Sequence, residues 1–186
     1  EIIPILPGDF RGEYSNCIKD NDLIIGVSQS GETKDLIDIF NDIDAKELNV
    51  RKVVLVNNMN STLGQEKSDV AIPILCGPEI AVPATKSFMN QITLFYYLAI
   101  KTAQMKLEEI DNNLTQEQRI RRQQELDDYF ASLSKIPSLL KETLDNVSGE
   151  IEFMAGKIYM EPSIHILATK ISGVAMEGAL KIRETV

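Results

Sequence analysis

Small polar side chains crowd one short stretch that directly follows an apolar run. They are Ser28, Gln29, Ser30 and Thr33, with Gly31 among them. A hydroxyl group or a side-chain amide can donate a hydrogen bond to a phosphate oxygen. The helical pattern that follows adds unpaired backbone N–H groups and the positive end of a helix dipole, and both attract anions. The stretch is therefore predicted to bind the phosphate group of a small molecule.

An ordinary helix cap is the alternative interpretation of the same turn. A serine or threonine before a helix commonly accepts hydrogen bonds from the first N–H groups, and Ser30 could do only that. A cap needs one such residue, whereas this turn offers three hydroxyl groups and one amide within six positions. That excess favours an anion site.

A second set of reactive side chains lies near the end of the sequence. Glu177, Lys181 and Glu184 are four and three residues apart, so a helix places them on one face. A carboxylate can move a proton between neighbouring carbons, and an ammonium group beside it can stabilise an oxyanion. The same spacing is routine for ion pairs on a helix surface, and the residues alone favour that interpretation. Gly178 and Ala179 permit close packing, which is more consistent with a buried helix.

The elements that must position these residues alternate between strands and helices. Apolar runs predict strands at 1–6, 23–27, 52–56 and 70–75, with helical patterns at 33–48 and 62–67. This alternation predicts an α/β fold, a parallel sheet with helices on both faces. Ligands bind beyond the carboxyl ends of such strands. The turn at 28–33 and the loop at 76–84 both follow strands, so both are expected at that edge.

Helices are predicted for most of the remaining sequence. The segment 86–106 is apolar nearly all round, which favours a central position or a subunit interface. The segment 111–125 is interpreted as a solvated helix face, because acidic residues balance its arginines. Pro137 is expected to begin a new helix at its first turn. Residues 163–168 are predicted to form a strand with the single histidine, His165, in a core position.

Composition limits the classes of partner. The net charge of −9 argues against nucleic acids and anionic membranes, and the apolar fraction of 44% is enough for a core. No segment reaches the roughly 20 continuous apolar residues of a membrane span, and the first residues lack a signal-peptide pattern. Cys17 and Cys76 have no metal-ligand spacing. We expect a reduced, cytoplasmic chain without a metal or cofactor.

Three motifs in order carry a resemblance to a known family. They read Ser-Gln-Ser-Gly-Glu-Thr at 28–33, Gly-Pro-Glu-Ile-Ala-Val-Pro-Ala-Thr-Lys-Ser-Phe at 77–88, and Met-Glu-Gly-Ala-Leu-Lys-Ile-Arg-Glu at 176–184. The chain resembles sugar isomerase (SIS) domains, and more narrowly the isomerase half of glutamine–fructose-6-phosphate aminotransferases. The resemblance implies a flavodoxin-like three-layer sandwich. It also implies a first SIS domain at 1–110, a helical connector at 111–160 and the start of a second SIS domain at 161–186.

The resemblance also implies a function. The chain would bind a phosphorylated sugar and isomerise a ketose to an aldose, as part of glucosamine 6-phosphate synthesis from fructose 6-phosphate. The implied substrate-binding residues are Ser28, Gln29, Ser30, Thr33 and Val82. Glu184 matches the glutamate that transfers the proton, and Lys181 matches its partner, with Glu177 on the same face. A homodimer is also implied, because SIS domains commonly dimerise.

The chain departs from the family pattern at several positions. Ala84 stands where a serine is usual, and Ala168, Thr169 and Lys170 replace a Gly-Arg-Gly turn. The Gly-Thr-Ser turn and the C-terminal lysine of the family have no counterpart, so we expect a piece of a larger two-domain enzyme. The alternatives are an amino-sugar phosphate deaminase or deglycase of the same fold, or a non-catalytic phosphosugar sensor. The charge of Lys86 could point into the pocket, but we favour a structural role, either at the surface or paired with a carboxylate such as Glu79.

Overall fold

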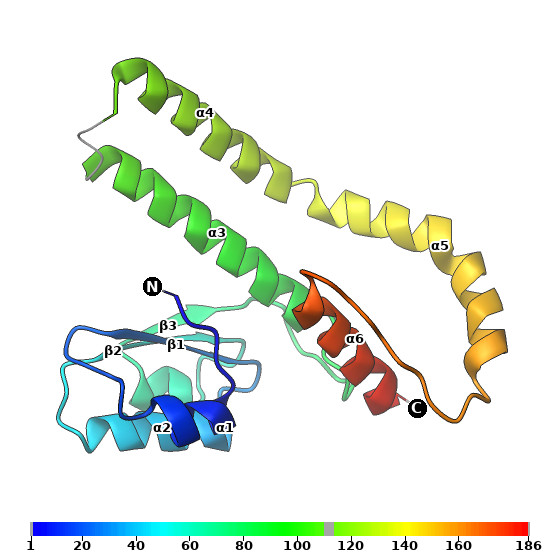
Figure 1. Cartoon of the computed structure of the whole chain (residues 1–186), viewed down its shortest axis with the longest axis horizontal. Coiled ribbons are helices and arrows are strands. Elements are labelled where there is room, and N and C mark those ends of the chain that lie inside the picture. The colour runs from blue at the N-terminus through cyan, green and yellow to red at the C-terminus, as the bar shows by residue number, and fades with distance from the viewer. Residues whose placement is uncertain (1, 110–113, 186) are drawn as a thin grey trace. The chain divides into compact units, whose positions relative to one another are not determined.

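The computed structural model describes residues 2–109 and 114–185. The chain divides into two compact units, Glu1–Ile92 and Thr93–Val186. The long helix α3 (Lys86–Glu109) begins in the first unit and continues into the second (Figure 1). The domain boundaries expected near residues 110 and 160 remain predictions.

The first unit is an α/β fold around a parallel sheet of three strands. The strands are β1 (Leu23–Ser28), β2 (Arg51–Val56) and β3 (Val70–Pro73), in the order β1-β2-β3. The helical elements are α1 (Pro7–Asp9), α2 (Lys34–Asp44) and two short π-helices, η1 (Phe10–Tyr14) and η2 (Leu63–Lys67). Parallel strands need crossover connections, and α2 and η2 provide them. The predicted α/β fold with its parallel sheet is confirmed.

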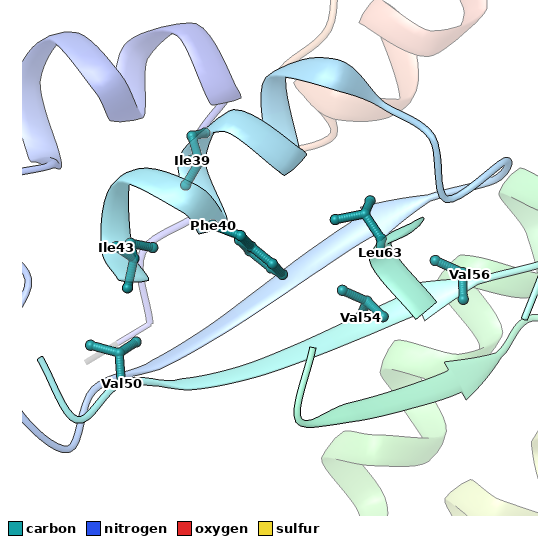
Figure 2. Packing of buried hydrophobic residues seen from close by; sticks show 7 residues of the cluster. All are labelled: Ile39, Phe40, Ile43, Val50, Val54, Val56 and Leu63. Atoms are coloured by element: carbon teal, nitrogen blue, oxygen red, sulfur yellow. The ribbon is translucent and has the colours of Figure 1, made fainter. Parts of the chain in front are cut away.

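The core of the first unit lies between α2 and the sheet. Its buried side chains are Ile39, Phe40, Ile43, Val50, Val54, Val56 and Leu63 (Figure 2). Helical spacing places the α2 residues on one face, and the alternation of β2 points Val54 and Val56 at that face. A Cβ atom added at Gly26 would lie 3.1 Å from Cζ of Phe40. The glycine therefore lets the phenyl ring lie close to β1.

The N-terminal segment differs from its prediction. A strand was expected at 1–6, but the described residues 2–6 have no regular secondary structure, and Ile2 is exposed. An apolar run becomes a strand only when a neighbouring strand satisfies its backbone groups. The sheet pairs β1 with β2 alone, so this segment has no such neighbour among the described residues.

The second unit is helical throughout its regular structure. It contains the rest of α3, α4 (Gln116–Leu133), α5 (Ile136–Ile158) and α6 (Ser172–Thr185). Thr115 begins α4 with a capping box, and Pro137 lies in the first turn of α5 as predicted. No buried residue occurs in α4, α5 or α6. Across the described ranges, no helix has both the length and the hydropathy that a membrane span requires.

The prediction of a strand at 163–168 is wrong. The segment has no regular secondary structure, and its apolar side chains Ile164, Ile166 and Leu167 are exposed. The three strands of the sheet all belong to the first unit, so none of them pairs with this segment. As a consequence, His165 is exposed and not in a core position as expected.

Candidate functional site

Three loops leave the strands of the first unit at their carboxyl ends. We call them the first loop (28–33, starting at the last residue of β1), the second loop (57–62, after β2) and the third loop (74–85, after β3). The strands are parallel, so all three loops lie at one edge of the sheet, where ligands bind in such folds. The sequence pattern predicted the first and third loops at this edge and overlooked the second. We refer to the three loops together as the polar edge.

The first loop is a tight turn built on Ser28. The Oγ atom of Ser28 accepts a hydrogen bond from Gly31 N at 2.9 Å and lies 2.7 Å from Oγ1 of Thr33. Ser28 is only 5% exposed, whereas Ser30 and Thr33 are exposed. Ser30 accepts from Glu32 N at 3.1 Å and is not the cap of α2. The loop thus presents Thr33 and Ser30 to solvent and holds Ser28 behind them.

Backbone donors follow the first loop. Thr33 occupies the N-cap position of α2, but its side chain accepts no capping hydrogen bond. The N–H groups of Lys34 and Asp35 have no acceptor among the described residues. Unpaired N–H groups at a helix N-terminus, together with the helix dipole, favour a bound anion.

The second loop fixes the shape of the first. Leu63 N donates to the carbonyl oxygen of Gly31 at 3.1 Å, and Ser61 lies against the glycine with 1% of its surface exposed. Gly31 adopts φ 73°, and a Cβ atom built there would lie 1.9 Å from Oγ of Ser61. Both the backbone conformation and the available space therefore require glycine.

Glu32 adds a second link between these two loops. Its carboxylate accepts a hydrogen bond from Thr62 N at 2.8 Å. Hydrogen bonds from the backbone and the side chain of Thr62 lower the pKa of Glu32. The carboxylate is therefore ionised at neutral pH and holds the exposed side of the turn. The polar run 57–62 at the end of β2 was the signal that could have identified this contact from sequence.

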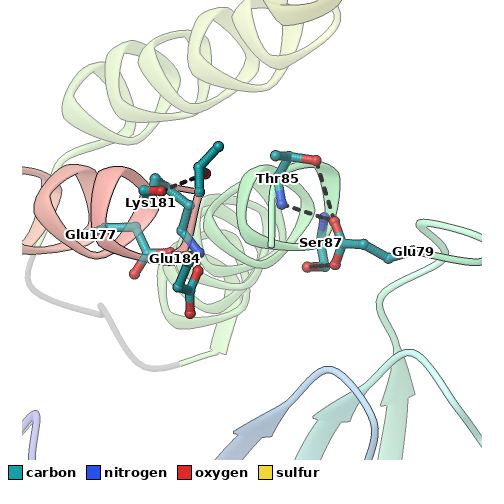
Figure 3. Close-up of polar contacts among 7 residues, drawn as sticks. Glu79, Thr85, Ser87, Glu177, Lys181 and Glu184 are labelled. Carbon is teal, nitrogen blue, oxygen red and sulfur yellow. Dashed lines mark hydrogen bonds and ion pairs between the residues drawn. The ribbon is translucent and has the colours of Figure 1, made fainter. Parts of the chain in front are cut away.

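Glu79 lies in the third loop and links that loop to the start of α3. The carboxylate accepts hydrogen bonds from Thr85 N at 2.9 Å, from Ser87 N at 3.3 Å and from the Ser87 hydroxyl (Figure 3). Desolvation alone would raise the pKa of Glu79, but the hydrogen bonds from Ser87 and Thr85 outweigh it, and the pKa is lowered. Glu79 therefore caps α3 as an anion.

Two further residues of this region have clear positions. Lys86 donates to the carbonyl oxygen of Pro78 at 2.6 Å, which is a structural contact, although with a carbonyl and not with a carboxylate. Val82 is 83% exposed on the third loop, and its predicted contact with the sugar stays a prediction.

The charged residues predicted near the end of the sequence come together on α6. Nζ of Lys181 lies 3.1 Å from Oε1 of Glu177 and 2.9 Å from Oε2 of Glu184 (Figure 3). The exposed fraction of the side chain is 24% for Lys181, 25% for Glu177 and 27% for Glu184. The hydrogen bond to Glu184 is the largest cause that raises the pKa of Lys181; partial burial opposes it and Glu177 adds to it. The ammonium group therefore stays charged between two carboxylates.

Comparisons with known proteins identify the family of the chain. Residues 5–101 match the family model described as SIS domain. The chain is 34% identical over 168 residues to a glutamine–fructose-6-phosphate aminotransferase (isomerizing) of Aquifex aeolicus, and 30% identical over 183 residues to that of Pyrobaculum aerophilum. These matches cover 90% and 98% of the chain, but only 24% and 27% of the relatives, so the chain spans about a quarter of their length.

A solved structure is similar over nearly the whole chain. It is the C-terminal domain of glucosamine-fructose-6-phosphate aminotransferase from Francisella tularensis, with a TM-score of 0.76 and 26% sequence identity. The match covers 96% of this chain and 46% of that structure. The similarity therefore extends beyond the sheet to the helical second unit.

Proposed function

Because the chain belongs to the SIS domain family, we propose that its first loop binds the phosphate group of a sugar phosphate. The chain is related to the isomerase domain of glutamine–fructose-6-phosphate aminotransferases. The substrate named in those relatives makes fructose 6-phosphate the first ligand to test.

The observation that carries the proposal is the set of donors at the start of α2. The free N–H groups of Lys34 and Asp35 stand next to the Ser28 and Thr33 hydroxyls, at the carboxyl end of β1. A phosphate dianion needs several donors that converge, and hydrogen bonds to a charged acceptor are about twice as strong as neutral ones. The turn before these donors is held by the hydrogen bond from Leu63 N to Gly31 and by the contact of Gly31 with Ser61, so the ligand has little to order.

For the second unit, we propose that Glu184 is the base of a ketose–aldose isomerisation. Glu184 takes a proton from C1 of open-chain fructose 6-phosphate, and the C1–C2 bond becomes double while a proton passes from the O1 hydroxyl to O2. Glu184 then returns its proton to C2, which gives the aldose. Lys181 stabilises the negative charge on oxygen during both transfers, and Glu177 keeps the ammonium group in place.

Calorimetry on the purified 186-residue chain tests the binding step. We expect fructose 6-phosphate and inorganic phosphate to bind, and the double substitution Ser28→Ala with Ser30→Ala to abolish both. Ser138→Ala is the matched control, because this exposed serine lies on α5, where its hydroxyl donates to the carbonyl oxygen of Lys135. If the double variant binds as tightly as the original chain, the first loop is not the phosphate site.

Proton exchange tests the isomerisation step separately. In D2O, an active base exchanges the C1 hydrogen of fructose 6-phosphate with solvent, which NMR detects. We expect Glu184→Gln to lose this exchange while the affinity for the sugar phosphate stays unchanged, and Glu150→Gln on α5 to leave both unchanged. A chain that binds the ligand but shows no exchange even with Glu184 present would instead be a sensor.

A further inference from the structure

We propose that Asn57 is a positioning residue that holds the third loop in register with the first loop. The inference rests on the proposed sugar phosphate site and deepens it. The side chain of this second-loop residue would fix the distance between the part of the site that binds the sugar and the part that binds the phosphate.

Asn57 directly follows the central strand β2 and contacts both neighbouring loops. Its backbone N–H donates to the carbonyl oxygen of Gln29 at 3.1 Å in the first loop. Its side-chain amide accepts from Cys76 N at 3.1 Å and donates to the carbonyl oxygen of Gly77 at 2.8 Å in the third loop. One residue thus connects the two loops that the proposed ligand would contact.

The side-chain contacts take over where the sheet ends. Ile74 N donates to the carbonyl oxygen of Val56 at 2.9 Å, in line with the ladder between β2 and β3. Beyond it the chain turns sharply, with left-handed conformations at Leu75 (φ 57°) and Gly77 (φ 66°). The Asn57 amide has the same donor and acceptor as a peptide group, so it continues the ladder across this turn.

Few other side chains can replace this amide. An aspartate keeps the acceptor for Cys76 N–H, but it has no donor and sets a negative charge against the Gly77 carbonyl oxygen. An alanine removes both contacts. In either variant the backbone bond from residue 57 to Gln29 persists, because it does not use the side chain. The substitutions therefore release the third loop and leave the first loop's own bonds in place.

Two ligands of different size separate these effects. Inorganic phosphate needs only the first loop, whereas fructose 6-phosphate also needs the third loop, which carries Val82. A residue that merely supports folding would affect both ligands together. A residue that positions the third loop affects only the sugar phosphate.

The experiment is calorimetry of the full 186-residue chain with each ligand. For Asn57→Ala, which removes two hydrogen bonds of ordinary strength, we expect the affinity for fructose 6-phosphate to fall about tenfold. Asn57→Asp removes only the bond to Gly77 but sets a negative charge against that carbonyl oxygen, so we expect a loss of similar size. The affinity for inorganic phosphate should stay within about twofold. The matched control is Asn60→Ala, an exposed asparagine in the same loop, and it should leave both affinities unchanged.

The remaining outcomes are decisive as well. Unchanged affinity for fructose 6-phosphate in Asn57→Ala, or an equal loss for both ligands, overturns the inference. If the original chain binds neither ligand, the proposed function itself fails and the inference fails with it. If the Asn57 variants do not fold, a measurement on the original chain replaces them. Hydrogen exchange at the Cys76 amide must then slow when fructose 6-phosphate is added and must not slow with inorganic phosphate. Exchange that responds to neither ligand or equally to both overturns the inference.

Discussion

Polar side chains are held in place differently at the polar edge and on α6. At the polar edge, the contacts join segments far apart in the sequence, as between Gly31 and Leu63 or between Asn57 and Gly77. On α6, Lys181 reaches carboxylates only three and four residues away on the same helix. The first arrangement exists only when the sheet has formed, whereas a single helix is sufficient for the second.

This difference has an energetic consequence. Contacts between distant segments exist only when the sheet and its core are formed, so a substitution that disturbs the core weakens many of them at once. Ion pairs along a partly exposed helix contribute little and nearly independently. Substitutions in the first unit should therefore be costly, and those on the second-unit helices should be mild.

A matched pair of phenylalanines gives the largest expected contrast. Phe40 is 0% exposed in the core of the first unit, whereas Phe153 on α5 is 65% exposed. We expect Phe40→Ala to lower the free energy of unfolding by about 3–5 kcal/mol, because it leaves a cavity. Phe153→Ala should cost less than about 1 kcal/mol. Urea denaturation measures both, and similar losses would contradict the contrast between the units.

Two glycines separate steric fit from backbone strain within the polar edge. Both Gly31 (φ 73°) and Gly77 (φ 66°) are left-handed, but only Gly31 lies against another side chain, that of Ser61. Gly31→Ala should cost about 2–4 kcal/mol, the sum of strain and overpacking. Gly77→Ala has open space and should cost about 1–2 kcal/mol. Thermal unfolding compares them; equal costs would mean that the second loop moves aside easily.

The cap of α3 predicts a pH dependence with a definite sign. The pKa of Glu79 is lowered in the folded chain, so its stabilising effect is complete above the unfolded value of about 4.5 and is lost as pH falls through the folded value. At neutral pH, Glu79→Gln should cost about 1 kcal/mol. Between pH 7 and pH 3 the variant should lose less stability than the original chain.

Thermal midpoints measured across this range test the sign. Glu150→Gln on α5 serves as the control, because that exposed position lies outside the cap. If Glu79→Gln follows the same pH curve as the original chain, then the carboxylate is not the group that caps α3.

The smallest effect is expected on α6. Lys181→Met removes two ion pairs but keeps most of the unbranched apolar stem, so the free energy of unfolding should change least of the four cases. Half a molar of added salt should remove most of that difference, since it screens partly exposed charges. A loss as large as that of Gly31→Ala would place Lys181 in a network that extends beyond one helix.

Local patterns were sufficient to predict much of the first unit. Continuous apolar runs identified β1 and β2, and the polar turn after β1 was recognised from its hydroxyl groups. The spacing of Glu177, Lys181 and Glu184 also predicted their contact, because helical geometry alone brings them together. The catalytic and substrate-binding roles assigned to these residues stay predictions.

Long-range contacts limited what the sequence could predict. The roles of Asn57 and Ser61 arise from partners about 20 to 30 residues away, and nothing in their immediate neighbours indicates those partners. The segment 163–168 has strand propensity, but propensity does not form a strand without a partner to pair with. The local sequence pattern therefore does not show which distant backbone groups a residue will contact.

The carboxylate bridge from Glu79 to Ser87 has one more consequence. It closes the residues between them into a small ring, while Val82 and Ile80 remain exposed on it. Much of the conformational entropy of this ring has been lost before any molecule arrives. A ligand that bound to this ring would therefore lose less conformational entropy in ordering it than a ligand that bound to an open loop.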